Sequence, residues 1–419
     1  MGRRKKDIAS HSLSYYAIQR LKKDKLAMFG LFVIAFTTFI AITGSLIRPD
    51  SSAHANDQKL QLRKKHPGFK ITMIKVRKNN KVETTFFWER MFFGGKEKQY
   101  KEIPIHSYEF AENVIIVEEY TGMNEDFPGK KIPIHLADVL YKIDTDNKFQ
   151  EDTKGNMTFY VDGELTEQSI EEMRKIIEEK NIITKRFWFG ADLAGRDMLS
   201  RLMAGTIVSL SVGFISVFIS LVIGILLGSI GGFFKGWVDD IIMWVINVVW
   251  SIPTLLLVIA ITFALGKGFW QIFVAVGLTM WVEVARVVRG QVISLREKEF
   301  VEAGRALGFS NFRLISRHVL PNVMGPVIVI SAANFASAIL IESGLSFLGI
   351  GIQPPMVSWG KMIKDHYGFI VGNEAFLSIL PGLAISMMVF AFMLVGNGLR
   401  DALDTTATFE SDAKNIPTG

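Results

Sequence analysis

Long runs without a charged residue constrain this chain more than any other feature. Five stretches of roughly 18 or more residues contain no Asp, Glu, Lys or Arg. They are Leu26–Ile47, Thr206–Ile230, Ile241–Leu265, Val319–Ile341 and Ala375–Leu399, and a sixth, Phe269–Val288, carries Glu283 and Arg286 near its end. A helix of this length crosses the hydrocarbon layer and satisfies its own backbone hydrogen bonds there. The sequence therefore predicts an all-α polytopic membrane protein with six transmembrane helices.

The composition agrees with a membrane protein. Of the 419 residues, 49% are hydrophobic and 21% charged, which is unlike a soluble enzyme. The net charge of +6 lies entirely in residues 1–25, where eight Lys or Arg face two Asp. A basic cluster beside an apolar run is typical of a cytoplasmic flank, and nothing else in the sequence indicates nucleic-acid binding. Without cysteine, the chain has no thiolate nucleophile, disulfide or Cys-ligated metal.

Basic residues also predict the orientation of the spans. Arg20, Lys22, Lys23 and Lys25 precede the first run and place the N-terminus in the cytoplasm. Six spans then return the C-terminus to the cytoplasm and leave residues 289–318, themselves basic, inside. The division that follows is a cytoplasmic segment 1–25, a first span 26–47, an extracytoplasmic domain 48–188, a five-helix core 189–400 with a cytoplasmic loop 289–320, and a cytoplasmic tail 401–419.

The hydrophilic block 48–188 is long enough to fold as an inserted domain. Alternating apolar residues and turn signals predict an α+β fold for it. The expected elements are strands at Lys70–Val76 and Val82–Trp88 around a turn at 78–80, a strand at Met157–Val161 before the turn Asp162-Gly163, and an amphipathic helix at Thr166–Lys180 with Ile170, Met173, Ile176 and Ile177 on one face.

The loop between the fourth and fifth spans reads EFVEAGRALGFSNFRLISRHVLPNV from Glu299 to Val323. This pattern predicts a short helix, a break at Gly308, and a second, basic helix that ends just before a span. Small residues at Ala303, Gly304 and Gly308 leave room for the surface of another protein, with Glu302 and Arg305 as polar anchors. A short helix joined to two spans can move them when a partner presses on it. The alternative is an ordinary loop in which the glycine only stops a helix.

This loop resembles the "EAA" coupling loop of binding-protein-dependent ABC importer permeases. Gly308 and the final Leu320-Pro321 have the family spacing, and the second alanine of the motif is replaced by Gly304. The resemblance assigns contact with a partner ATPase to Glu302, Ala303, Gly304, Arg305, Gly308, Leu320 and Pro321. It also implies the type I ABC importer permease fold.

Four further segments are similar to the C-type permease subunits of oligopeptide and dipeptide importers. They are LKKDKLAMFGLFVI at Leu21–Ile34, the segment Phe189–Gly213, the outward loop Glu342–Ile363, and the last span and tail Leu380–Asp404. Ala191, Ala194 and Asn397 depart from the family pattern. The similarity covers residues 20–50 and about 186–404, so residues 51–185 are an insertion. Its role stays open between docking the substrate-binding protein and bracing the partner permease.

The resemblance implies a transport subunit of a bacterial plasma membrane importer and no catalysis by this chain. Its partners would be a homologous B-type permease, two ATPase subunits that hold ATP and Mg, and an extracytoplasmic solute-binding protein. The chain has no GxxxxGK[ST] loop of its own, and its seven histidines form no metal motif, so no cofactor is expected.

Two other functions remain open at this point. The first is a membrane-anchored sensor or assembly factor that acts through the outer domain, and the second is a secondary transporter. The second is disfavoured because Glu283 and Arg286, one helical turn apart, are expected to pair near the inner end of their span rather than form an ion path. Pro253 and Pro326 are expected to kink or hinge their helices.

Overall fold

A computed structural model describes residues 13–79, 97–122, 128–143, 150–151, 155–161, 164–266 and 268–403. The chain divides into two compact units. The described part of the first, helical unit lies within Met1–Ala41, Gly205–Tyr367 and Ser378–Gly419, and the second unit comprises Ile42–Ala204 and Gly368–Leu377. Each unit has its own hydrophobic core.

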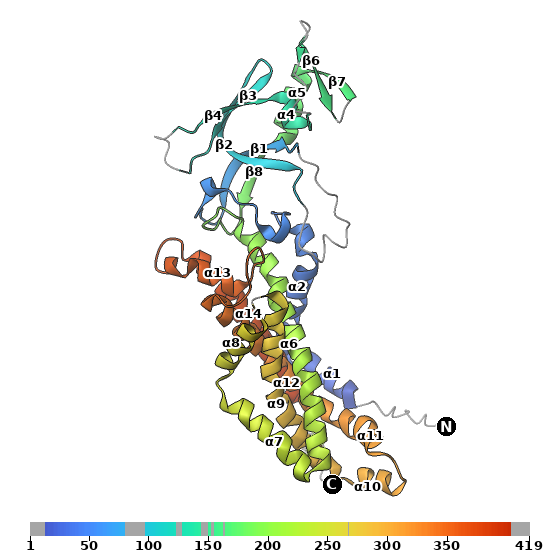
Figure 1. Ribbon diagram of the computed structural model, residues 1–419. Helices are drawn as coiled ribbons and strands as arrows, with labels where there is room; N and C mark the ends of the chain where they lie inside the picture. Colours follow the sequence, from blue (N-terminus) through green and yellow to red (C-terminus); the bar gives the residue numbers. More distant parts are fainter. Residues whose placement is uncertain are drawn as a thin grey trace, which may run out of the picture. The chain divides into compact units, whose positions relative to one another are not determined.

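The first unit is built from long apolar helices (Figure 1). Its helices are α1 (Leu13–Lys23), α2 (Lys25–Ile47), α6 (Met198–Phe234), α7 (Gly236–Ser251), α8 (Thr254–Leu265), α9 (Phe269–Arg296), α10 (Glu299–Ala306), α11 (Asn311–Arg313), η4 (Leu314–Val319), α12 (Leu320–Leu348), α13 (Trp359–His366), η5 (Tyr367–Phe369) and α14 (Phe376–Leu403), of which α2, α6, η5 and α14 extend into the second unit. Among the described residues, five helices are long and apolar enough to cross a membrane, or six spans if one bent pair counts as one. The predicted runs at 26–47, 206–230, 269–288, 319–341 and 375–399 are confirmed as helical.

The third predicted span is a bent pair of helices, with its break at the expected Pro253. Residues 241–265 form α7 and α8, which are bent by 95° at the break between Ser251 and Thr254. Pro253 has no N–H for the helical ladder, and the residue before it, Ile252, is extended with φ −91° and ψ 128°. Pro326, by contrast, lies inside α12 without interrupting it. Only one of the two predicted proline sites therefore redirects the chain.

Glycines bring α6 and α9 into backbone contact. Gly224, Gly228 and Gly232 recur every fourth residue on α6 and face α9. A Cβ added at Gly228 would lie 2.5 Å from the carbonyl oxygen of Ala285, and one at Gly232 would lie 2.8 Å from that of Arg289. Small residues at such spacing let two membrane helices approach closely.

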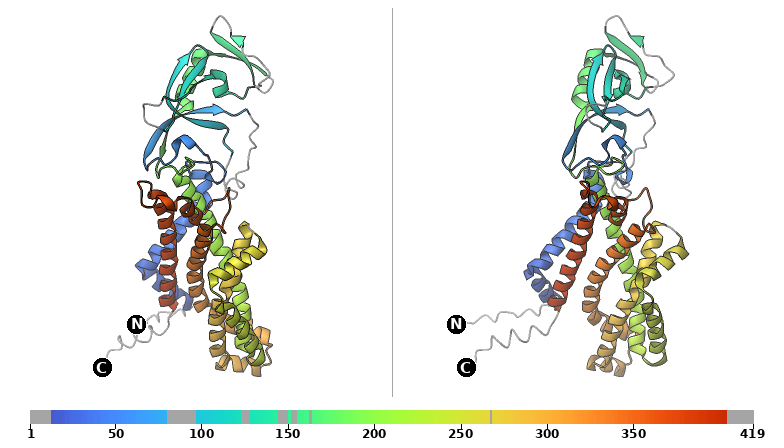
Figure 2. Two further views of the ribbon diagram at one scale, coloured as in Figure 1. Left: turned by 60° about the vertical axis from the view of Figure 1, so that its left-hand side comes forward. Right: turned by 90° about the vertical axis from the view of Figure 1, so that its left-hand side faces the viewer.

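The N-terminal span packs on the C-terminal one. A Cβ added at Gly30 of α2 would lie 2.6 Å from the carbonyl oxygen of Ala391 in α14. Both views of Figure 2 show these two helices, blue and red, side by side. The two ends of the helical unit are thus held together by a contact that only glycine permits.

The second unit holds an antiparallel five-stranded sheet in the order β4-β3-β2-β1-β8 and a three-stranded sheet β5-β6-β7. The strands are β1 (Phe69–Arg77), β2 (Tyr100–Ala111), β3 (Val114–Glu119), β4 (Lys131–His135), β5 (Gln150–Glu151), β6 (Asn156–Val161), β7 (Glu164–Ser169) and β8 (Ile182–Phe187). Short helices complete the unit: η1 (Ala53–Ala55), η2 (Leu60–Leu62), α4 (Leu136–Leu140), α5 (Ile170–Ile176) and η3 (Ile177–Asn181).

Both faces of β1 are buried. Ile74 belongs to a core with Met173 and Ile177 from the α5–η3 segment. The preceding residue, Met73, belongs to a second core that includes Leu62. Successive side chains of a strand point to opposite faces. The central strand is therefore covered on both sides, which makes this unit a folded domain with its own interior.

The structure corrects part of the expected α+β pattern. The predicted strands 70–76 and 157–161 are confirmed as β1 and β6, while Val82–Trp88 and part of the turn after β1 lie outside the described residues, as does the turn at 162–163. The helix predicted at Thr166–Lys180 is wrong at its start, because residues 166–169 belong to β7 and pair with β6, with Thr158 opposite Glu167. Strand pairing overrides the helical periodicity there, and the helix begins at Ile170.

A cluster of charges lies inside the second unit. The Glu102 carboxylate accepts Lys185 Nζ at 3.1 Å and Lys98 Nζ at 3.2 Å, and Lys59 Nζ lies 3.4 Å away. Burial raises the pKa of Glu102, but Lys185, Lys98 and Lys59 lower it more, to about 2. Lys98 also bonds Asp57 at 2.7 Å, and these charges raise its pKa. The network joins β2, β8 and the segment that leads in from α2.

Candidate functional site

The segment between α9 and α12 folds as the sequence predicts up to Gly308. Helix α10 ends in a turn in which Gly308 has φ +73°, a conformation that side-chain-bearing residues rarely adopt. The Gly308 N–H donates to the Arg305 carbonyl at 2.9 Å, and the Phe309 N–H donates to the Gly304 carbonyl at 3.0 Å. This pair of bonds is the Schellman arrangement that closes a helix and reverses its direction. Gly308 thus sets the angle between α10 and the following helix.

The short helix is fixed to the membrane helices by a buried apolar cluster. Val301 of α10 and Leu314 of η4 pack with Phe233 at the end of α6, Val292 of α9 and Val323 of α12. These side chains are between 0% and 3% exposed. Because α10 shares one core with three long helices, a force on its outer face is transmitted to them.

The structure places the predicted contact residues on different sides of this helix. Glu302, Ala303, Arg305, Gly308 and Pro321 are exposed, and Leu320 is half-buried. They form the outer surface of the segment 299–321. The described part of the chain therefore leaves most of the predicted coupling residues free for a partner.

Gly304 is the exception. It is buried, and an added Cβ would lie 2.7 Å from Leu314 Cδ2 and 3.3 Å from Phe309 Cδ2. The expectation that Gly304 leaves room for another protein is wrong, because the space is filled by the chain's own η4. The glycine that departs from the family motif lets α10 sit closer to the helix that follows it.

Three exposed apolar side chains of this segment escaped the sequence reasoning. Phe300 is 43% exposed, Leu307 72% and Phe312 80%. Buried Val301 and Gly304 are three residues apart on α10, and Phe300 and Leu307 fall outside that inward stripe. The sequence signal that could have identified these residues is the presence of large apolar side chains outside the buried face of a short amphipathic helix. We call Phe300, Leu307 and Phe312 the apolar rim.

Aromatic contacts stiffen the second half of the segment. The Phe309 ring stacks on His318 with centroids 5.7 Å apart, and the Arg313 guanidinium lies 3.9 Å from the Phe309 ring centre. His318 is thus a packing residue at this helix. Among the described residues, no group of three or more His, Asp or Glu is arranged to hold a metal ion.

An ion pair joins α7 to α9. Arg289 Nε and one terminal nitrogen each lie 2.6 Å from an oxygen of Asp239, a bidentate contact. Parallel bonds of this kind fix orientation as well as distance. Sequence reasoning did not single out this pair, because its members are 50 residues apart.

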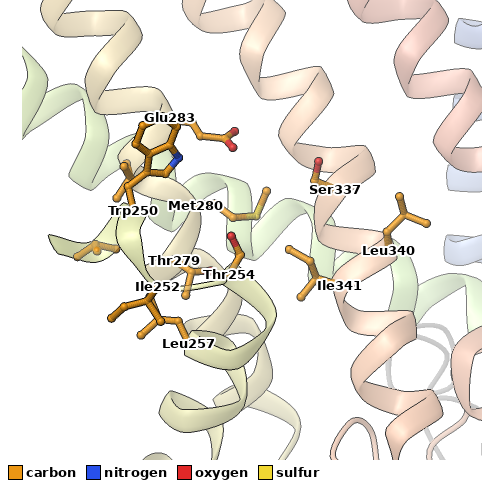
Figure 3. Close-up of a pocket in the computed structure, with 12 residues that line it drawn as sticks. Trp250, Ile252, Thr254, Leu257, Thr279, Met280, Glu283, Ser337, Leu340 and Ile341 are labelled. Carbon is orange, nitrogen blue, oxygen red and sulfur yellow. The ribbon is translucent and has the colours of Figure 1, made fainter. Parts of the chain in front are cut away.

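A cavity of about 330 Å³ lies in the helical unit between α7, α8, α9 and α12 (Figure 3). Glu283 lines it together with Trp250, Thr254, Thr279 and Ser337. The expected ion pair between Glu283 and Arg286 is wrong, because the Arg286 guanidinium lies over the Trp250 ring, 4.0 Å from its centre, instead. The indole competes successfully for this cation.

Glu283 is also not near the end of its helix. Helix α9 continues to Arg296, so 14 residues precede Glu283 and 13 follow it. The charged residues of the second half of α9 misled the span prediction, which stopped at Val288. The carboxylate therefore lies halfway along a long helix.

Comparison with protein families matches two parts of the chain. Residues 201–408 match the model described as "Binding-protein-dependent transport system inner membrane component", and residues 12–67 match "N-terminal TM domain of oligopeptide transport permease C". Residues 68–200, which hold the eight strands of the described part of the chain, lie between the two matches.

Curated relatives match about half of this chain. The dipeptide transport system permease protein DppC of Alkalihalophilus pseudofirmus is 41% identical over 52% of this chain and 71% of its own length. The oligopeptide permease OppC of Bacillus subtilis is 39% identical over 53% and 72%, and the glutathione permease GsiD of Pectobacterium atrosepticum 38% over 52% and 72%. A solved MetNI methionine ABC transporter structure is 18% identical with a TM-score of 0.41, covering 49% of this chain and 98% of that one.

The assignment rests on the sequence matches, which span both ends of the helical unit. The family's members are multi-pass inner-membrane proteins that transport without catalysis and work with ATPases and a binding protein. The chain belongs to the binding-protein-dependent transport system inner membrane components, as a permease subunit of the DppC and OppC type.

Proposed function

We propose that this permease forms half of the translocation pore of an ATP-driven importer for peptides. The three relatives named above carry dipeptides, oligopeptides and glutathione by their names, and all of these are peptides. The other half of the pore is a homologous B-type permease, and two ATPase subunits bind beneath the pair. The bilayer surrounds the helical unit.

The coupling residues of this proposal are Glu302, Ala303, Arg305, Gly308, Leu320 and Pro321, with the apolar rim around them. Gly304 contributes from the buried side of α10, because its lack of a side chain lets α10 pack against η4. The single observation that supports this role best is the shared core of α10 with three long helices, since it ties an exposed contact surface to the spans. ATP closes the ATPase dimer, the dimer moves α10, and the helices change between inward-open and outward-open states.

Charge supports the orientation in which both termini and the loop 289–320 face the cytoplasm. In that orientation the domain 48–188 faces outward, between the first span 26–47 and the core 189–400. Its position on the side of the binding protein is consistent with either of two roles, docking that protein or bracing the partner permease. The division into a segment 1–25 and a tail 401–419 completes the proposed topology.

A matched pair of substitutions tests the coupling surface. Leu307→Ser removes a 72% exposed side chain from the apolar rim, and Leu165→Ser makes the same change at a 64% exposed site on β7 of the second unit. Neither leaves a cavity, so both proteins should fold. We expect the ATPase subunits to co-purify in mild detergent with the Leu165 variant but to be depleted with the Leu307 variant.

The rival functions give different outcomes. A sensor that acts through its outer domain would keep its activity after Leu307→Ser and would purify without ATPases. A secondary transporter would import without ATP and stop when an ionophore collapses the ion gradient. Either outcome would refute the coupling role.

A further inference from the structure

The carboxylate of Glu283 in the helical unit has no role in the proposed coupling mechanism. It lies at the middle of α9 and is exposed, yet no Lys or Arg nitrogen of the described residues comes within 4.0 Å of it. The nearby Arg286 is held on the face of Trp250. A charged group within a membrane helix is costly, and such groups usually face a partner or an aqueous path.

The surroundings of Glu283 suit a positive charge. Figure 3 shows the carboxylate beside the Trp250 indole and pointing toward the side on which Ser337 of α12 lies. Thr254, Thr279 and Ser337 also line the cavity, and hydroxyl oxygens accept hydrogen bonds from ammonium and guanidinium groups. Thr279 Oγ1 already donates to the Val276 carbonyl at 2.8 Å, which leaves its lone pairs to accept.

The shape of the cavity fits a group larger than a water molecule. Its volume of about 330 Å³ is at the lower end of the range for small-molecule sites. The remaining wall is apolar, with Met280, Ile341 and Leu257 among its residues. A long side chain with an apolar stem and a cationic tip matches this lining, because its stem suits the apolar wall and its tip suits the carboxylate.

We propose that this cavity is a transit site for the cationic side chain of a transported peptide, with Glu283 as the group that binds the ammonium or guanidinium. The inference rests on the proposed function, since it needs a solute that passes through this permease. It adds a preference within that function, namely that lysine- and arginine-containing peptides are favoured over acidic ones at the membrane step.

The test compares two peptides in proteoliposomes that contain the complete transporter, its binding protein and enclosed ATP. The probes are Ala-Lys-Ala and Ala-Glu-Ala, and the readout is the ratio of their uptake rates. We expect Glu283→Gln to lower this ratio at least about tenfold and Glu283→Asp to lower it less. Glu171→Gln, the same change on an exposed helix of the second unit, should leave it unaltered. ATP hydrolysis stimulated by the binding protein should persist in all three variants.

A second variant guards against a folding defect of Glu283→Gln. Ile341→Lys places an ammonium group in the cavity while Glu283 remains, and we expect the same loss of preference. An unchanged ratio in both variants, or an equal fall in uptake of both peptides, would overturn the inference. Loss of the second permease from purified Glu283→Gln would also overturn it, because Glu283 would then pair with a cation of that subunit. If the wild-type transporter takes up neither peptide, the proposed function fails, and the inference with it.

Discussion

Replacing Gly228 by alanine tests whether α6 and α9 depend on backbone contact. The added methyl carbon would lie 2.5 Å from the Ala285 carbonyl oxygen, 3.1 Å from the Ala285 Cα and 2.9 Å from Val288 Cβ. A carbon and a carbonyl oxygen settle at about 3.3 Å or more, so one backbone must move by roughly 0.8 Å. Neither of these two atoms of Ala285 can rotate away as the tip of a side chain could, because both belong to the backbone.

The expected magnitude is the difference between two opposing effects. Overpacking costs about 1–3 kcal/mol, and two backbone contacts place this site near 3 kcal/mol. Alanine gains about 1 kcal/mol over glycine inside a helix. Gly228→Ala should therefore destabilise the helical unit by about 2 kcal/mol.

The control is Gly290→Ala on α9, where an added Cβ meets nothing within 4 Å. At this site only the higher helix propensity of alanine acts, so the free energy of unfolding should rise by up to about 1 kcal/mol. Thermal unfolding of the purified permease in one detergent measures both variants against wild type. Two shifts in the same direction, or a Gly228 variant as stable as wild type, would refute the steric reasoning.

Three further predictions follow from the charges and turns. Glu102 contributes about 3 kcal/mol to the second unit at neutral pH, because its pKa falls from 4.5 to about 2 on folding. This stability is present above pH 4.5 and is lost as the pH falls toward 2, so Glu102→Gln should lower the unfolding temperature at pH 7 and weaken the acid dependence; an unaltered acid profile would contradict this. Gly308→Ala should cost about 1 kcal/mol through its left-handed backbone alone and slow ATP-dependent uptake, while Gly308→Asn should retain more activity, and equal rates would count against the turn. Asp239→Asn should destabilise the helical unit by about 2 kcal/mol, and adding Arg289→Gln should cost less than the sum of the single changes; strict additivity in thermal unfolding would show that the pair does not interact.

The apolar runs were sufficient to locate the long helices because the membrane requires both length and the absence of charge. They could not give the 95° bend at Pro253. A proline indicates a lost hydrogen bond, but the angle depends on how α8 packs on α9, which residue order does not state. The same limit applied to Pro326, whose helix runs on without a break.

The sequence motif identified the coupling loop, but it did not show which side chains of the loop point inward and which are exposed. Gly304 faces inward because Leu314 fills the space in front of it, and this contact depends on the reversal at Gly308. Glu283 was misjudged because charges after Val288 hid the true length of α9. The pairing of Arg286 with Trp250 joins two helices across a bend and leaves no local pattern.

The two strands by which the chain enters and leaves the sheet domain are neighbours. Phe69 at the start of β1 lies opposite Phe187 at the end of β8, and opposite residues in an antiparallel pair are about 5 Å apart at Cα. The chain therefore enters and leaves a segment of more than a hundred residues at nearly the same point. A domain attached in this way can be gained or lost by a gene with little strain on the flanking chain, and a short turn from 69 to 187 should suffice to excise it for a minimal transporter.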